Sequence, residues 1–410
     1  MMYIADFHIH SKYSRATSKN MDIEHLTRWA KNKGISLLGT GDITHPLWFA
    51  EIRKKLQPSE KEGIYTFDGI DFILSGEVNN IFTKNKAVRK IHNIVFFHSF
   101  EGAEKFNKNL EKFTELLIDG RPILQIDART LVKMVRDADP EGFVVPAHIW
   151  TPHFSLFGAN SGFDRIEDCF EEETSNIFAL ETGLSSDPPM NWLLSMLDQF
   201  MLISNSDAHS PQKIGREANV FSESFSFLEL KKILKTQDKT RFLFTIEYFP
   251  EEGKYHYDGH RLCKVRLSPE ETLKNRLLCP VCGKKVTVGV MHRVTTLADR
   301  KNQNQPANRI GYKHLVPLDQ IIASVYQKDT EANFTTQMYA QVTGKLGPEL
   351  KILLEIPEQE LFANLPKELA TGIKLVREEK LVVIPGYDGE FGTVKINPLL
   401  SESQVQQTLF

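Results

Sequence analysis

The chain has 410 residues, of which 41% are hydrophobic and 25% are charged, and its net charge at neutral pH is −3. This length predicts two or three domains, and the composition is ordinary for a soluble globular protein. No apolar run approaches membrane-spanning length and the first residues read as a strand rather than a signal peptide, so we expect a cytoplasmic protein with no membrane partner.

The first predicted strand covers residues 3–10 and ends in two histidines. Side chains alternate along a strand, so Asp6, His8 and His10 share one face, which makes a metal half-site. Two polar residues at a strand end explain a single His-x-His equally well. Later segments repeat the same layout, and this repetition favours the metal.

Strands and helix-length segments then alternate through the first half of the chain, with helices predicted at residues 26–32, 103–118 and 128–138. The strands are predicted at residues 35–40, 71–76, 91–97, 142–147, 176–180 and 200–205. Near-continuous apolar strands are typical of parallel sheets, and an α/β barrel carries its active site at the carboxyl ends of its strands. We therefore expect the residues that follow these strands to converge on a metal site: His8, His10, Asp42, Glu77, His98, His148, Asp207 and His209.

Five further polar residues are less clearly placed. His45 and Glu181 also follow strand ends and are weaker candidates for the same metal site. His92 falls inside a predicted strand and His153 in a loop, so both are expected to be structural or solvent-facing. His25 is predicted to lie on a helix surface.

These segments together resemble the motifs of the polymerase-and-histidinol-phosphatase (PHP) family over about residues 1–245. The matching segments are Asp6-Phe7-His8-Ile9-His10, Gly41-Asp42, Gly76-Glu77, His98, Pro146-Ala147-His148 and Ser206-Asp207-Ala208-His209. The resemblance implies a distorted seven-stranded barrel and a metal-dependent phosphoesterase with two or three metal ions. The chain departs from the pattern at Ile43 and at Ser14 and Arg15, where many members have histidine. A third metal would then have an unusual ligand set, such as Asp42, His45 and His209, or be weakly held.

The resemblance also implies a role for each expected ligand. Two metal ions about 4 Å apart clamp the attacking and leaving oxygens of a phosphate ester. Glu77 is expected to bridge the ions, with His8, His10 and Asp207 completing one site and His98 with His148 the other. The first four of these form the expected catalytic set. Histidine and carboxylate ligands suit zinc, manganese, magnesium or iron.

A basic segment follows the predicted barrel, with thirteen Lys or Arg against four Asp or Glu in residues 253–313. His260 and Cys263 form one pair of candidate ligands and Cys279 and Cys282 another, each separated by two residues. This spacing is typical of a zinc ribbon that holds one structural zinc. His256 competes with His260 as the fourth ligand, and a redox pair or unliganded thiols are alternative explanations.

Basic segments beside a phosphoesterase favour nucleic acid as the partner, because phosphates bind to such surfaces. A solvated basic face is the alternative. The candidate DNA contacts are Lys284, Lys285, Arg293, Arg309 and Tyr312.

The last hundred residues are predicted to be mainly helical, at 317–326, 331–343, 349–355 and 366–378, followed by strands at 380–384 and 391–396. Residues 302–308 are predicted to form a polar loop. The expected domains are a PHP phosphoesterase barrel at 1–248, a basic zinc-binding module at 249–313 and a DNA-binding domain at 314–410.

The combined pattern resembles the endonuclease Q family over essentially the whole chain. The additional matching segments are Asp258-Gly259-His260, Cys279-Pro280-Val281-Cys282-Gly283, Val288-Gly289-Val290, Leu297-Ala298-Asp299-Arg300 and Ile384-Pro385-Gly386-Tyr387-Asp388-Gly389. The resemblance implies incision of DNA 5′ of abasic sites and of deaminated bases (uracil, hypoxanthine or xanthine), with the lesion base flipped out and no protein partner required. Spacing and composition alone indicate only a metal-dependent phosphoesterase that binds nucleic acid. A small-molecule phosphatase and a non-enzymatic DNA-binding protein with a decayed site are the alternatives.

Overall fold

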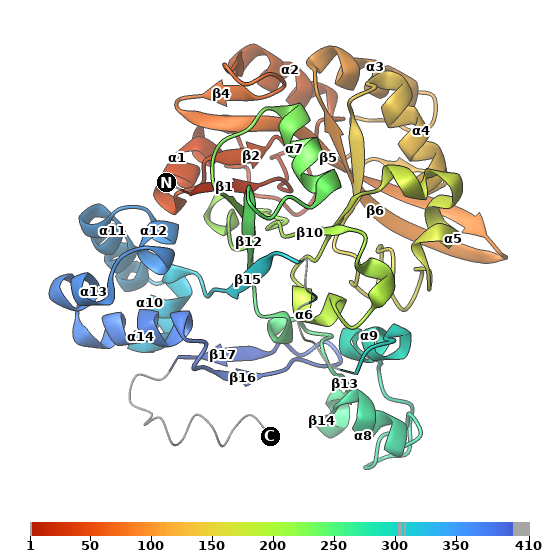
Figure 1. Cartoon of the computed structure of the whole chain (residues 1–410). Coiled ribbons are helices and arrows are strands. Elements are labelled where there is room, and N and C mark those ends of the chain that lie inside the picture. The colour runs from red at the N-terminus through yellow and green to blue at the C-terminus, as the bar shows by residue number, and fades with distance from the viewer. Residues whose placement is uncertain (1, 302–305, 307–308, 397–410) are drawn as a thin grey trace.

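A mixed β-sheet forms the centre of the N-terminal part in the computed structural model, which describes residues 2–301, 306 and 309–396 (Figure 1). β1 (Tyr3–Asp6), β2 (Leu37–Gly39) and β5 (Ile70–Lys84) are parallel neighbours. β11 (Ala218–Phe221) and β12 (Phe242–Glu247) extend the sheet beyond β1 in antiparallel order. The predicted mixed α/β class is confirmed, and the seven-stranded barrel stays a prediction.

One strand departs from the predicted parallel order. β6 (Ala87–Phe97) forms a long hairpin with β5 and also pairs antiparallel with β8 (Phe143–Pro146). The hairpin turns at Asn85 and Lys86, whose φ angles are 51° and 61°, the conformation that two-residue hairpin turns require. An antiparallel strand brings its amino end, not its carboxyl end, to the face where the parallel strands finish.

Helices cover the sheet, and the predicted helix 128–138 agrees with α4 (Ala128–Ala138). α3 (Phe100–Leu110) begins three residues before the predicted helix 103–118, because the Ser99 side chain accepts from the Gly102 amide, and it is shorter at its other end. The remaining helices and strands of this part are α1 (Ile23–Lys33), α2 (Pro46–Lys55), β3 (Gln57–Pro58), β4 (Tyr65–Phe67), β7 (Ile123–Leu124), α5 (Ile166–Phe170), β9 (Ala179–Glu181), α6 (Pro188–Asn191), β10 (Met201–Ile203) and α7 (Phe227–Thr236).

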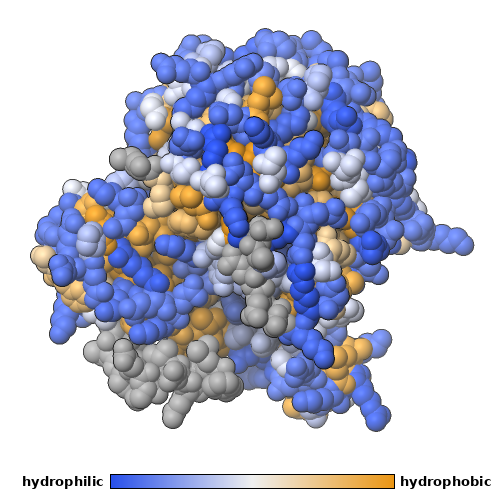
Figure 2. All heavy atoms as spheres, in the orientation of Figure 1, coloured by the Kyte–Doolittle hydropathy of each residue, from blue (hydrophilic) through white to orange (hydrophobic). Residues whose placement is uncertain are grey.

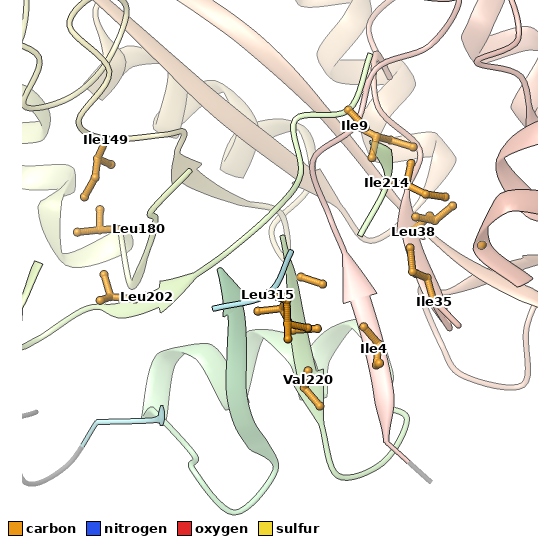
Figure 3. Packing of buried hydrophobic residues seen from close by; sticks show 14 of the residues in the cluster. Ile4, Ile9, Ile35, Leu38, Ile149, Leu180, Leu202, Ile214, Val220 and Leu315 are labelled. Atoms are coloured by element: carbon orange, nitrogen blue, oxygen red, sulfur yellow. The ribbon is translucent and has the colours of Figure 1, made fainter. Parts of the chain in front are cut away.

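Branched apolar side chains fill the space between the sheet and its helices (Figure 3). Ile4, Leu38 and Val220 project from β1, β2 and β11, and each is at most 3% exposed. Burying one such side chain contributes roughly 1.5–3 kcal/mol. The strand ends that carry the polar residues are therefore held by a continuous apolar core.

The Cys–His module, which we define as residues 258–297, lies at one end of the molecule and contains β13 (Asp258–His260), β14 (Val265–Leu267), α8 (Pro269–Lys274) and α9 (Val290–Leu297) (Figure 1). β15 (Gly311–His314) then returns to the main sheet and pairs parallel with β12. Residues 311–313, expected in the basic module, are thus part of the sheet. The predicted loop 302–308 lies mostly outside the described residues.

The C-terminal part is mainly helical, as predicted, with one short helix that the sequence analysis did not predict, α13 (Glu358–Asn364). The other elements are α10 (Leu318–Tyr326), α11 (Asn333–Leu346), α12 (Glu349–Leu354), α14 (Lys367–Arg377), β16 (Val382–Ile384) and β17 (Thr393–Lys395). A buried ion pair of 2.7 Å between Lys33 of α1 and Glu349 of α12 joins these helices to the N-terminal part. Within the described ranges, no helix is both long and apolar enough to cross a membrane.

Candidate metal centre

Three side chains from opposite ends of the N-terminal part form what we call the His8 group: His8, His10 and Asp207, whose ligand atoms all lie within 4.8 Å of one another. His8 and His10 follow β1 and share a face, as the alternation predicted. Nε2 of His10 lies 2.8 Å from Oδ1 of Asp207, and Nε2 of His8 lies 3.8 Å from the same oxygen. Both rings are at most 1% exposed, whereas the Asp207 side chain is 30% exposed.

A second set, the His92 group, consists of Glu77, His92 and His148. Oε1 of Glu77 lies 2.5 Å from Nδ1 of His92 and 3.0 Å from Nε2 of His148. The other oxygen, Oε2, lies 3.8 Å from Nε2 of His8 and 3.7 Å from Nε2 of His10. Glu77 therefore presents one carboxylate oxygen to each group.

The geometry around His8 fits a bound divalent ion. Nε2 of His8 is buried and has no hydrogen-bond partner among the described residues, although Oε2 of Glu77 and Oδ1 of Asp207 both lie 3.8 Å away. Two ligand atoms that each bind one ion at about 2.1 Å are separated by roughly 3–4 Å. An ion between these atoms would satisfy the imidazole nitrogen, which otherwise carries a desolvation penalty.

Asp42 and Glu181 lie behind the histidines rather than among the ligands. Nδ1 of His8 lies 3.0 Å from Glu181, and Nδ1 of His10 lies 3.1 Å from Asp42. Carboxylates in this position fix the tautomer of a metal-binding histidine, with Nε2 left free for the ion. Both carboxylates were expected to be ligands, but neither belongs to the His8 group or to the His92 group; each instead faces the Nδ1 atom of a histidine.

The carboxylates of the two groups are held in their ionised form. Burial raises the pKa of Glu77, but the neighbouring His92, His148 and His8 more than offset it, and the net pKa lies well below the usual range. Burial likewise raises the pKa of Asp207, and its hydrogen bond to His10 and the charge of His8 reverse the shift. Metal binding requires deprotonated carboxylates, so the ionised form of Glu77 and Asp207 is the form that can bind a metal.

Strained backbone accompanies the site. His148 has a φ of 29°, Asp207 of 47° and Asp42 of 43°, values that are uncommon for residues with a side chain. Such residues cost of order 1–3 kcal/mol each and persist where the surrounding structure holds them, often at functional sites.

His98 is not part of either group, which corrects the expected ligand set. Its ring packs against Phe227 at 5.5 Å, and its Nε2 lies 3.5 Å from Glu62. Because β6 runs antiparallel to β5, its carboxyl end, which His98 follows, points away from the site, whereas His92, in the middle of β6, pairs with Asn79, two residues from Glu77. The sequence contains a signal for this, since the Lys84-Asn85-Lys86 segment between two strand-like runs is a hairpin pattern.

The expected third metal set of Asp42, His45 and His209 is not assembled at metal-binding spacing within the part of the chain described. One Asp42 oxygen is occupied by Ser11 and Ser14, whose hydroxyls lie 2.6 and 2.9 Å away. The His45 ring stacks on Tyr13 at 4.4 Å. His209 lies beside the His8 group, with its ring 4.5 Å from that of His10.

The Cys–His module gathers its four expected ligands, His260, Cys263, Cys279 and Cys282, whose ligand atoms lie within 4.8 Å of one another. Burial raises the pKa of Cys279, but the amides of Cys282 and Val281 more than offset it, and the net pKa is about 7. Tetrahedral zinc suits this donor set. His256, the competing ligand, is buried and stacks on Tyr257 instead.

The five candidate DNA contacts separate into two classes. Lys284 and Lys285 are exposed and follow Cys282 in the Cys–His module. The end of the molecule that carries this module has both hydrophilic and hydrophobic residues on its surface (Figure 2). Arg293 and Arg309 instead donate to backbone carbonyls of the N-terminal part, and Tyr312 packs on Trp192 at 5.6 Å. The basic segment thus uses part of its charge inside the protein.

Comparisons with known proteins cover both halves of the chain. The family model "MJ0043 C-terminal domain" matches residues 317–380. The uncharacterised protein MJ0043 of Methanocaldococcus jannaschii is 31% identical over 257 residues, which are 61% of this chain but only 31% of that relative. The uncharacterised protein YqxK of Bacillus subtilis is 29% identical over 409 residues, which are 95% of this chain and 98% of YqxK.

Two solved structures are similar to the whole chain, each with 29% sequence identity. The match to the lesion-specific endonuclease PfuEndoQ from Pyrococcus furiosus has a TM-score of 0.87 and covers 100% of both chains. Endonuclease Q in complex with a 27-mer duplex substrate that has an abasic lesion at the active site has a TM-score of 0.84, with 100% of this chain and 99% of that chain covered. The resemblance predicted from the motifs is confirmed: over its whole length, the chain is similar to endonuclease Q.

Proposed function

We propose that this protein is a metal-dependent DNA repair endonuclease that hydrolyses the phosphodiester bond 5′ of deaminated bases and abasic sites. The observation that carries the proposal is Glu77, whose two oxygens face two separate histidine-containing groups. The similarity of the whole chain to endonuclease Q supports DNA as the substrate.

The residues that would hold the ions are His8, His10 and Asp207 at one position and His92 and His148 at the other, with Glu77 between them. Divalent ions bound there supply Lewis-acid stabilisation of a phosphate ester and activate water at neutral pH. Asp42 and Glu181 hold the imidazoles of His10 and His8 so that Nε2 faces inward.

The phosphodiester would approach from the side of Asp207 and His209. These two side chains are 30% and 31% exposed, whereas Glu77 is 1% exposed. Burial mainly lowers the pKa of both His92 and His209, and the charge of Arg121 adds a smaller effect in the same direction, so Arg121 lies within electrostatic reach of both rings. A cation there attracts the phosphate backbone.

A cavity of about 290 Å³ beside the His92 group is the candidate site for the flipped-out lesion nucleotide. Its lining includes Thr151, Leu184, Tyr255 and Phe391, and Oγ1 of Thr151 lies 3.1 Å from Nδ1 of His148. Flipping costs a few kcal/mol, less for a mispaired base, which gives a first level of selectivity. A pocket that donates a hydrogen bond to the carbonyl formed by deamination would give a second level of selectivity. In an undamaged base an amino group takes the place of this carbonyl, so two hydrogen-bond donors would face each other without an acceptor.

A labelled duplex with one deoxyuridine, deoxyinosine or abasic site, incubated with manganese, magnesium or zinc, tests the proposal. We expect one incision immediately 5′ of the lesion. His92→Ala should abolish it and His98→Ala should retain it, because only His92 lies beside Glu77. Cleavage of undamaged DNA at the same rate would contradict lesion specificity. Rapid hydrolysis of a small phosphate ester without incision would favour the small-molecule phosphatase.

A further inference from the structure

The loop after β8, residues 149–163, lies behind both histidines of the His92 group. The Phe154 carbonyl accepts from the backbone N–H of His92 at 3.0 Å, and the two rings pack at 5.1 Å. Oγ1 of Thr151 lies 3.1 Å from Nδ1 of His148, whose Nε2 faces Glu77 at 3.0 Å. The position of this loop therefore sets how His92 and His148 are aimed at Glu77.

One arginine from the Cys–His module closes the end of this loop. Arg293 in α9 donates from Nε to the Phe157 carbonyl and from Nη2 to the Phe163 carbonyl, both at 3.0 Å. It also pairs with Asp164 next to that second carbonyl. The two carbonyls are six residues apart in sequence, so one guanidinium holds both sides of the loop. Its planar fork makes these bonds at once, which the point charge of a lysine on a flexible chain does not reproduce.

The helix that carries Arg293 is fixed in turn to the zinc ligands. Asp258 is fully buried and accepts from the Gly289 amide at 2.7 Å and from Nδ1 of His292 at 2.6 Å, at the start of α9. Asp258 is also the first residue of β13, and His260, the last residue of that strand, is one of the four candidate zinc ligands. Contacts therefore run without a break from the zinc ligands to the loop behind His92 and His148.

We propose that Arg293 is a positioning residue through which the Cys–His module holds the His92 group in its metal-binding geometry. This inference rests on the proposed function, since it takes the His92 group to bind a divalent ion. Contacts behind metal-binding histidines change metal affinity by about 10- to 100-fold when they are removed. The module then completes the metal site as well as offering Lys284 and Lys285 to DNA.

The test uses the full-length protein with its structural zinc in place and no DNA. Manganese binding is titrated by calorimetry, and amide hydrogen exchange is followed across residues 149–163. Arg293→Ala and Arg293→Lys should each lower the affinity for one of the two manganese ions about 10- to 100-fold and speed amide hydrogen exchange in the loop. The matched control is Arg266→Ala, because Arg266 lies in the same module but donates to the Pro385 carbonyl instead. This control should match the wild-type protein in both measurements.

Arg293→Lys keeps the charge and most of the length of the side chain, so it provides a folded variant if the alanine variant is unstable. Wild-type manganese affinity and loop exchange in Arg293→Lys would overturn the proposal. Replacing Cys279 and Cys282 by serine should speed exchange in the same loop, and unchanged exchange would overturn the link to the zinc ligands. A wild-type protein that binds only one manganese ion would refute the two-ion site of the proposed function, and this inference with it.

Discussion

Replacing Glu181 by glutamine tests how a buried carboxylate prepares His8 for metal. Glu181 is fully buried, and its partners are all donors: Oε1 lies 3.0 Å from Nδ1 of His8 and 2.8 Å from Nδ2 of Asn205, and Oε2 lies 2.7 Å from the His148 amide. Glutamine offers one oxygen and one NH₂ in place of two acceptors. In either orientation of the amide, the NH₂ group faces a buried donor.

The size of the effect follows from these contacts. A buried donor left without an acceptor costs about 1–3 kcal/mol, so we expect the free energy of unfolding to fall by about 2 kcal/mol. His8 can relieve part of this cost by accepting at Nδ1 from the new NH₂ group, which moves its proton to Nε2. A protonated Nε2 does not bind a metal, so affinity at the His8 group should fall about 10- to 100-fold.

Urea unfolding measures the first effect and manganese titration the second. Glu217→Gln is the matched control, because Glu217 is equally buried and its pKa is raised well above its usual value by burial and by the charge of Glu247. The raised pKa favours the neutral carboxyl of Glu217, which an amide resembles, so the substitution should change little. Wild-type stability and metal affinity in Glu181→Gln would refute the role of Glu181 in setting the His8 tautomer.

Asp207→Asn should abolish hydrolysis but leave DNA binding largely intact, because affinity comes mainly from phosphate contacts elsewhere; equal turnover would remove Asp207 from the catalytic set. The variant with serine at both Cys279 and Cys282 should lose one zinc by elemental analysis and bind DNA more weakly, without directly losing metal from the His8 and His92 groups, and full zinc content with full binding would exclude the zinc ribbon. Burial raises the pKa of Glu247 to about 8 from its usual 4.5, so its contribution to stability is complete below about pH 4.5 and is lost as the pH rises to 8. Glu247→Gln should remove this loss, which is at most about 1.4 kcal/mol per pH unit. If the difference in unfolding free energy between the variant and the wild type is the same at pH 5 and at pH 8, this role of Glu247 is excluded.

Short-range patterns in the sequence determined several parts of the site. The alternation of a strand places His8 and His10 on one face, and the structure brings both beside Asp207. The two-residue spacing within each pair of candidate zinc ligands brings Cys279 next to Cys282 by turn geometry alone. Helical periodicity likewise located α4 and most of the C-terminal helices.

Only the tertiary structure decided which expected ligands face the site. The pattern of a strand such as residues 91–97 is the same in either strand direction, so the sequence analysis selected His98, whereas the antiparallel strand presents His92. In the sequence Glu181 resembles a metal ligand, but in the structure its oxygens accept from Asn205 and His148. Arg293 likewise resembles a DNA contact in the sequence, but its guanidinium donates to carbonyls of the loop. The physical reason is that periodicity and spacing act between near neighbours in sequence, whereas the partner of a buried polar group is chosen by contacts between segments far apart in the chain.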